Sequence, residues 1–130
     1  MPNAGANILV VEDEAPLREL VADELAAASY RVQAAADGRE ALELIERSPP
    51  DLILSDIRMP HIDGFELLET TRARFPALAT TPFIFLSALA ERDDMLAGLN
   101  AGAEDYITKP IDFDLLLTKI HSREIGRAHV

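Results

Sequence analysis

The stretch DLILSDIRMPHIDGFELL, residues Asp51–Leu68, decides the fold. It begins with the apolar run Leu52–Leu54, which ends in the polar residues Ser55 and Asp56. A short apolar run without alternation is typical of a strand buried on both faces, as in a parallel sheet covered by helices. A turn segment follows, and from Phe65 the apolar residues return at helical spacing. The stretch therefore predicts one strand–turn–helix unit.

Similar units lie on either side of this stretch. Apolar runs predict four further strands: Ile8–Val11, Phe83–Leu86 and the weaker Arg31–Ala35 and Tyr106–Thr108. Each is followed by apolar residues at helical spacing. In chain order these are Leu17, Leu20, Val21 and Leu25; Leu42 and Ile45; Met95, Leu96 and Leu99; and Phe113, Leu116, Leu117 and Ile120. In the central unit the helical positions are Phe65, Leu68, Arg72 and Phe75. Five strand–helix units predict one α/β domain, a doubly wound, five-stranded parallel sheet with five helices and right-handed crossovers.

The helix boundaries carry matching signals. Pro16 suits a first helical turn, Ser48-Pro49-Pro50 ends the second helix, Pro76 follows the third, and Asp112 suits an N-cap of the last. We expect a single domain over residues 1–130 with a core at about 7–122. Residues 123–130 are expected to be a helix end, the start of a linker or a remnant of how the chain was cut.

Composition limits the classes of function. A net charge of −11 with 12 scattered basic residues argues against direct nucleic-acid binding. No apolar run is long enough to cross a bilayer, the first residues do not resemble a secretory signal, and there is no cysteine. We therefore expect a cytoplasmic protein.

Polar side chains follow four of the predicted strands. Glu12 and Asp13 follow the first, Asp56 the third, Ser87 the fourth and Lys109 the fifth. In an open parallel sheet, ligands bind outside the carboxyl ends of the strands. If these strands are neighbours, which we assume here, one crevice holds three carboxylates, a hydroxyl and an ammonium.

This set of side chains suits phosphate chemistry on a metal ion. Three carboxylates repel one another, and Mg²⁺ relieves the repulsion while leaving room for a phosphate. The backbone carbonyl of Arg58 lies where it can join the coordination sphere. Lys109 adds a second cation for the phosphoryl oxygens, Asp56 can attack phosphorus, and Ser87 can donate a hydrogen bond. Zinc is not indicated, because His61, His121 and His129 lack ligand spacing.

Four segments together resemble the receiver domains of bacterial response regulators, over roughly Asn7–Ser122. They are ILVVEDE (Ile8–Glu14), DLILSDIRMPHIDGFELL (Asp51–Leu68), PFIFLSA (Pro82–Ala88) and AGAEDYITKPID (Ala101–Asp112). The resemblance implies the flavodoxin-like receiver fold with strand order 2-1-3-4-5.

The resemblance also implies a role for each site residue. Glu12 and Asp13 match the acidic pair that holds the metal, Asp56 the phosphoacceptor, and Lys109 the lysine of the motif, with its peptide to Pro110 in cis. Ser87 matches the hydroxyl residue that senses the phosphoryl group and Tyr106 the switch aromatic. The implied partners are a sensor histidine kinase or a histidine phosphotransfer protein, and an output domain or protein. A homodimer is possible through the face of the fourth helix (about Glu91–Asn100), fifth strand and fifth helix.

Some positions depart from the usual receiver pattern. Glu12 replaces the more usual Asp, which favours a water-mediated role and leaves Asp13 as the direct metal ligand. Ser87 stands where Thr is common. Arg58 and Leu89 flank the site at positions that vary in the family, and we expect them to tune the lifetime of the phosphate.

The same residues also allow structural interpretations. Glu12 and Asp13 also suit the start of a helix, Asp56 a loop cap, Ser87 a strand end, Lys109 a solvated surface position and Tyr106 half-buried packing. His61 is expected to be an exposed loop residue without a role.

Three other functions are alternatives to a phosphoacceptor switch. A phosphatase of the haloacid dehalogenase kind would carry its nucleophile after the first strand, in a DxD arrangement. A degenerate receiver used only for docking would lack Asp56 or Lys109. A flavodoxin-like cofactor binder would need a phosphate-binding loop after the first strand. The sequence thus favours a phosphoacceptor switch that is not an enzyme beyond limited self-phosphorylation from small donors and slow autodephosphorylation.

Overall fold

The computed structural model describes residues 5–88 and 105–128 of the chain. The elements in chain order are β1 (Asn7–Val11), α1 (Ala15–Ala27), β2 (Arg31–Ala35), α2 (Gly38–Arg47), β3 (Leu52–Asp56), α3 (Gly64–Arg74), a 3-10 turn (Pro76–Leu78), β4 (Phe83–Ala88), β5 (Asp105–Lys109) and α5 (Phe113–Ala128). All five predicted strands are confirmed, as are the helices after β1, β2, β3 and β5. The predicted fourth helix, Glu91–Asn100, lies outside the described residues.

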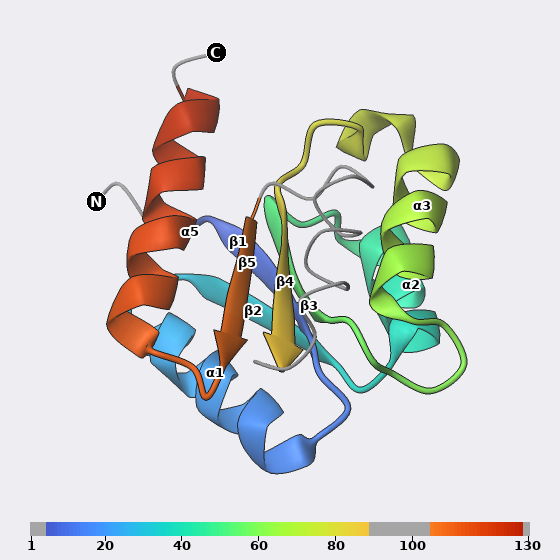
Figure 1. Ribbon diagram of the computed structural model, residues 1–130. Coiled ribbons are helices and arrows are strands. Elements are labelled where there is room, and N and C mark those ends of the chain that lie inside the picture. The colour runs from blue at the N-terminus through green and yellow to red at the C-terminus, as the bar shows by residue number, and fades with distance from the viewer. Residues whose placement is uncertain (1–4, 89–104, 129–130) are drawn as a thin grey trace.

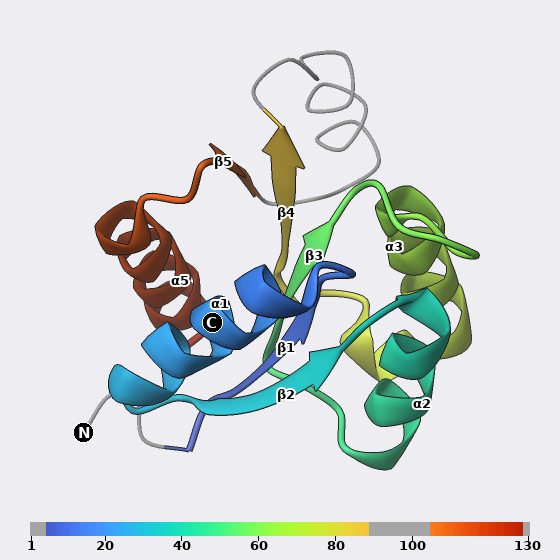
Figure 2. The same cartoon turned by 90° about the horizontal axis from the view of Figure 1, so that it is seen from below.

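The five strands form one parallel sheet in the order β2-β1-β3-β4-β5. This is the order that the resemblance implied. Helices α1 and α5 cover one face of the sheet, and α2 and α3 cover the other (Figures 1 and 2). The doubly wound α/β prediction is confirmed.

Burial of the sheet on both faces explains the unbroken apolar runs. Side chains along each strand point alternately to the two faces. In β1, Ile8 and Val10 pack in the cluster with Val21 and Leu25 of α1, whereas Leu9 and Val11 belong to the cluster on the opposite face. The same division runs through β3 and β4, with Leu52, Leu54, Ile84 and Leu86 in the first cluster and Ile53, Phe83 and Phe85 in the second. In the central strands β1, β3 and β4, the positions from Ile8, Leu52 and Phe83 up to the site are therefore apolar.

One predicted core position is wrong. Helical spacing put Leu20 on one face with Leu17, Val21 and Leu25, yet its side chain is 47% exposed. Val21 and Leu25 are fully buried and Leu17 is partly buried. Leu20 lies about 100° around the helix axis from Val21, outside the stripe that contacts the sheet.

The helix boundaries follow their capping residues. Pro16 lies in the first turn of α1, and α2 ends at Arg47 with Ser48 as its C-cap, before the two prolines. Asp63 and Glu66 form a capping box at α3, and Pro76 begins the turn after that helix. The Asp112 side chain accepts a hydrogen bond from the Leu115 amide at 3.1 Å, which confirms the predicted cap. Within the described residues, no helix has the length and apolar character needed to cross a membrane.

Candidate functional site

The sheet brings the predicted site residues to one edge. Glu12 and Asp13 directly follow β1, and Asp56 ends β3, the strand next to it. Ser87 lies near the end of β4, the next strand, and Lys109 ends β5 beyond it. The neighbouring strands assumed in the sequence analysis are therefore confirmed, because the order β1-β3-β4-β5 places four strand ends side by side.

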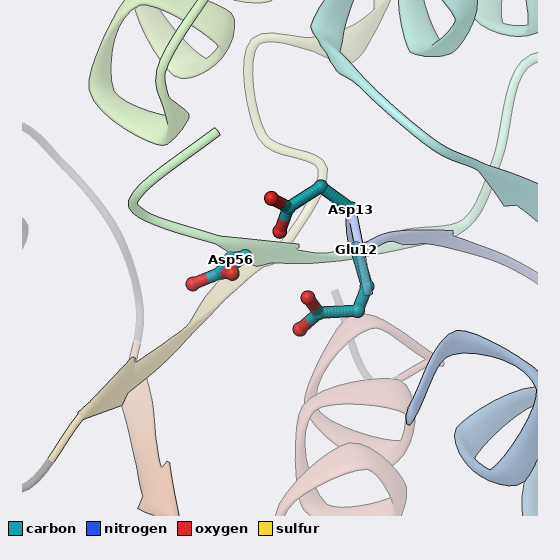
Figure 3. A group of neighbouring side chains, drawn as sticks. All are labelled: Glu12, Asp13 and Asp56. Atoms are coloured by element: carbon teal, nitrogen blue, oxygen red, sulfur yellow. The ribbon is translucent and has the colours of Figure 1, made fainter. Parts of the chain in front are cut away.

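The three carboxylates form a compact group. Glu12, Asp13 and Asp56 each offer an oxygen atom, and these oxygens all lie within 4.8 Å of one another. Figure 3 shows the three side chains converging from the ends of β1 and β3. Glu12 is fully buried and Asp56 is 6% exposed, whereas Asp13 lies open to solvent. The group thus combines two carboxylates that are buried away from water with one that is exposed to it.

Lys109 reaches this group from β5. Its Nζ lies 3.1 Å from Asp56 Oδ2 and 3.0 Å from Glu12 Oε1. The peptide bond between Lys109 and Pro110 is cis, as the resemblance implied. One ammonium therefore faces two buried carboxylates, and the group keeps a net negative charge when all three acids are ionised.

Glu12 is held on several sides. Its amide donates to the Ala35 carbonyl at 3.0 Å, and its Oε2 accepts from the Glu14 amide at 3.1 Å. Its carbonyl accepts from Nη1 of Arg18 at 2.8 Å. Oε1 is different: despite the ion pair with Lys109, the geometry gives it no hydrogen bond from the described residues. A buried carboxylate oxygen facing two other acids in this way suits a hard divalent cation such as Mg²⁺, directly or through its water.

Burial shifts the ionisation of these groups. Removal from water raises the pKa of Glu12 to about 7, and the neighbouring Asp56 charge adds to the shift. Burial likewise raises the pKa of Asp56, although Lys109 opposes the shift. Burial by itself would lower the pKa of Lys109, but Glu12 and Asp56 outweigh it and the pKa lies above its ordinary value. The site therefore holds more negative charge than its surroundings stabilise, which a proton or a divalent cation relieves.

Asp56 is fixed by its own backbone and by the start of α3. Its Oδ1 accepts a hydrogen bond from the Ile57 amide at 2.8 Å. The amide of Gly64 donates to the Ile57 carbonyl at 2.8 Å, which closes the loop after β3. A Cβ atom on Gly64 would lie 2.5 Å from the carbonyl oxygen of Asp56 and 2.9 Å from Phe85 Cε1. Only glycine allows this approach.

The sequence analysis missed the roles of Gly64 and Arg18. Gly64 lay within the predicted turn segment, and its place at the start of a helix, four residues after Pro60, was no sign of contact with Asp56. Arg18 carries no local motif. Its hydrogen bond to Glu12 appears only when α1 folds back against the end of β1.

The remaining predicted residues lie around this group. Ser87 is fully buried near the end of β4. Tyr106 of β5 pairs in register with Phe85 of β4 and packs, partly buried, against the cluster beneath α2 and α3. Arg58 is exposed in the loop after β3. Leu89 lies outside the described residues.

The two histidines that the structure describes, His61 and His121, lie on separate elements. His61 is exposed in the loop after β3, as predicted, with a positive φ of 69°. His121 lies on α5 and His129 lies outside the described residues. Among the described residues, the group of acids that can hold a metal is the one predicted from the strand ends.

Known proteins are similar to this chain in both sequence and fold. The family model of the response regulator receiver domain matches residues 8–121. The chain is 39% identical over 116 residues to the response regulator ArlR of Staphylococcus epidermidis, covering 89% of this chain and 51% of the relative. It is 38% identical over 123 residues to the probable transcriptional regulator ycf27 of Porphyridium aerugineum, covering 93% and 50%. The chain thus spans about half the length of these curated relatives.

Solved structures agree. A putative response regulator from Chloroflexus aurantiacus superposes with a TM-score of 0.88 at 32% identity, covering 93% of this chain and 98% of that one. The chemotaxis protein CheY4 of Vibrio cholerae gives a TM-score of 0.85 at 33% identity, covering 92% and 98%. Family match, sequence relatives and fold point the same way, and they confirm the resemblance seen in the four sequence segments. The chain belongs to the receiver domain family of two-component response regulators.

Proposed function

We propose that this domain is a phosphorylation-activated switch whose phosphoacceptor is Asp56. The observation that carries the proposal is the position of the Asp56 carboxylate. It lies at the end of the central strand, within 4.8 Å of two other carboxylates and 3.1 Å from the Lys109 ammonium. The proposed nucleophile, the acids that could bind a metal and the lysine cation therefore lie together at the carboxyl-terminal edge of the sheet.

The transfer is a displacement at phosphorus. A carboxylate oxygen of Asp56 forms a bond to the phosphorus of a phosphohistidine on a sensor kinase or phosphotransfer protein. The P–N bond breaks, and the imidazole leaves with its electron pair. During this displacement Lys109 exchanges its contact with the carboxylate for one with the phosphoryl oxygens, where its charge stabilises the transition state. Water later hydrolyses the acyl phosphate and restores the carboxylate.

Mg²⁺ is the cofactor that this site fits. Asp13 and Asp56, the Arg58 backbone carbonyl and Glu12, directly or through water, would hold it. When bound, it neutralises charge on the phosphoryl oxygens. Asp13 is the most accessible of the acids and has no hydrogen bond or ion pair with the other described residues, so it is free to coordinate.

The signal leaves through β4, β5 and α5. A phosphoryl group adds close to two negative charges and new acceptor oxygens, and Ser87 moves toward them to donate a hydrogen bond. Tyr106 then rotates into the space that is vacated. Asp105 at the start of β5 pairs with Lys119 of α5 at 2.8 Å and with Arg123 at 3.7 Å, so a shift of β5 reaches α5.

The proposed readout surface is formed by residues 91–100, β5 and α5. Its partner is an output domain or protein, or a second copy of the chain in a homodimer. With a net charge of −11 the domain itself is not expected to bind nucleic acid. We place it in the cytoplasm, where kinases of this class present their phosphohistidine, and we assign it no enzymatic activity beyond its own phosphorylation from small donors and slow hydrolysis.

Intact-mass measurement after incubation with acetyl phosphate tests the proposal. The parent chain should gain one phosphoryl group with Mg²⁺ and none with excess chelator. Asp56→Asn should gain none, whereas Asp23→Asn, a matched change at an exposed position of α1, should label like the parent. Equal labelling of Asp56→Asn would show that another residue accepts the phosphate.

A further inference from the structure

Arg18 links the first turns of α1 to the acidic group. Its Nη1 donates a hydrogen bond of 2.8 Å to the carbonyl oxygen of Glu12, six residues earlier. Its own amide donates to the Glu14 carbonyl at 2.9 Å and begins the hydrogen bonding of the helix. The side chain and backbone of Arg18 therefore bracket the segment that carries both acids of the β1 end.

The hydrogen bond falls on the peptide unit that joins Glu12 to Asp13. The other side of Glu12 is already fixed, because its amide bonds Ala35 and its Oε2 bonds the Glu14 amide. Asp13 has no such support from its own side chain, which lacks a hydrogen bond or ion pair within the described part of the chain. The Asp13 carboxylate is therefore carried by a peptide unit whose carbonyl oxygen accepts the hydrogen bond from Arg18.

If only its charge mattered, an arginine at this position would weaken the binding of a divalent cation. A guanidinium near three acids competes with a divalent cation for the same negative field. Arg18 forms no ion pair with a carboxylate among the residues that the structure describes, so it does not neutralise the group by direct contact. What it contributes is one directed hydrogen bond to a carbonyl, a positioning contact.

We infer that Arg18 is a positioning residue for magnesium binding, holding the Glu12–Asp13 peptide so that the Asp13 carboxylate faces Asp56. The inference rests on the proposed magnesium site. For a variant that lacks the Arg18 guanidinium, this inference and simple electrostatics predict opposite changes in Mg²⁺ affinity. Removal of a nearby positive charge tightens cation binding, whereas loss of the positioning contact weakens it.

Calorimetric titration with Mg²⁺ separates the two effects. Arg18→Met keeps the aliphatic stem and removes the donors and the charge. We expect its affinity for Mg²⁺ to fall roughly tenfold, the lower end of the loss seen when a supporting contact of a metal ligand is removed. Arg39→Met, which removes the same charge from an exposed position of α2, should bind Mg²⁺ within about twofold of the parent. Arg18→Lys, which keeps the charge and a donor, should lie in between.

Two further measurements distinguish positioning from general stability. Urea unfolding reports whether each variant is folded under the titration conditions. In the magnesium-free state, the amide resonances of Glu12, Asp13 and Glu14 should shift in Arg18→Met and return toward the parent in Arg18→Lys. If Arg18→Met does not fold, Arg18→Gln, which also removes the charge and shortens the side chain, takes its place: parent-like affinity and parent-like amide shifts in that folded variant would overturn the inference.

The possible outcomes are distinct. Equal or tighter Mg²⁺ binding by folded Arg18→Met would refute the positioning role and leave the proposed function intact. A parent chain that does not bind Mg²⁺ at all would instead refute the magnesium site on which the inference rests.

Discussion

The burial of Glu12 predicts how the stability of the metal-free domain changes with pH. The folded protein raises the pKa of this carboxyl from its ordinary 4.5 to about 7. A group whose pKa is raised on folding contributes stability below its unfolded pKa, and this stability is lost as the pH rises through the folded pKa. The Glu12 contribution should therefore be fully present near pH 4 and lost by about pH 7.

The magnitude follows from the same two values. At about 1.4 kcal/mol per pKa unit, the shift corresponds to a loss on the order of 3 kcal/mol in the free energy of unfolding. Glu12 is fully buried, so no discount for solvent screening applies. Because Asp56 and Lys109 interact with Glu12, the loss belongs to the titration of the group rather than to one side chain.

Glu12→Gln removes the charge while keeping the shape. The amide must direct its NH₂ group at either Lys109 or the Glu14 amide, which costs about 1 kcal/mol but does not depend on pH. Relative to the parent, the variant should therefore gain stability between about pH 4.5 and pH 7, by up to a few kcal/mol, and the difference should level off above pH 7. Glu19→Gln, at an exposed position of α1, should follow the parent at every pH.

Urea unfolding followed by far-ultraviolet circular dichroism suits the measurement, because the chain has no tryptophan. It should be done in the presence of a chelator, so that no divalent cation takes the place of the proton. Parallel stability profiles for the parent and Glu12→Gln across pH 5–8 would refute the reasoning, since they would mean that folding does not shift the ionisation of Glu12.

Three further predictions concern the site and its connections. Asp13→Ala should weaken Mg²⁺ binding in calorimetry more than Glu12→Ala, because the exposed Asp13 is free to coordinate whereas Glu12 pairs with a lysine; the reverse order would exchange their roles. With beryllofluoride, a phosphoryl mimic, Ser87→Ala should keep the amide shift changes at the acidic group but lose those at Tyr106, and a full pattern in the variant would exclude the serine relay. Gly64→Ala should cost about 1–3 kcal/mol in urea unfolding, because its Cβ would lie 2.5 Å from a backbone oxygen at the end of β3, and parent-like stability would contradict that close contact.

Much of the fold could be predicted from the sequence, because the pattern of apolar residues in each strand or helix indicates which of its faces are buried. Apolar runs such as Ile8–Val11 have no polar alternation, and both faces of the strand are indeed covered. Helix ends followed local rules, as the Asp112 cap shows. The exposed Leu20 shows where this kind of prediction fails. Helical spacing gives the angular position of a residue around the helix axis, but it does not give the width of the helix face that contacts the sheet.

The sequence by itself determined which chemical groups the site contains. Acids, hydroxyl and lysine lie at or just after the carboxyl ends of their strands, which periodicity and the rule for parallel sheets predict. That these ends are neighbours was assumed at that stage, with the strand order implied by the family resemblance, and the sheet confirms it. Tertiary structure alone decided how these groups interact. The Lys109 ammonium lies between Glu12 and Asp56, and burial raises the pKa of both acids. Arg18 and Gly64 join the site through contacts across chain segments. The physical reason is that distance and desolvation depend on every element packed around a group, whereas the local sequence specifies only the group itself.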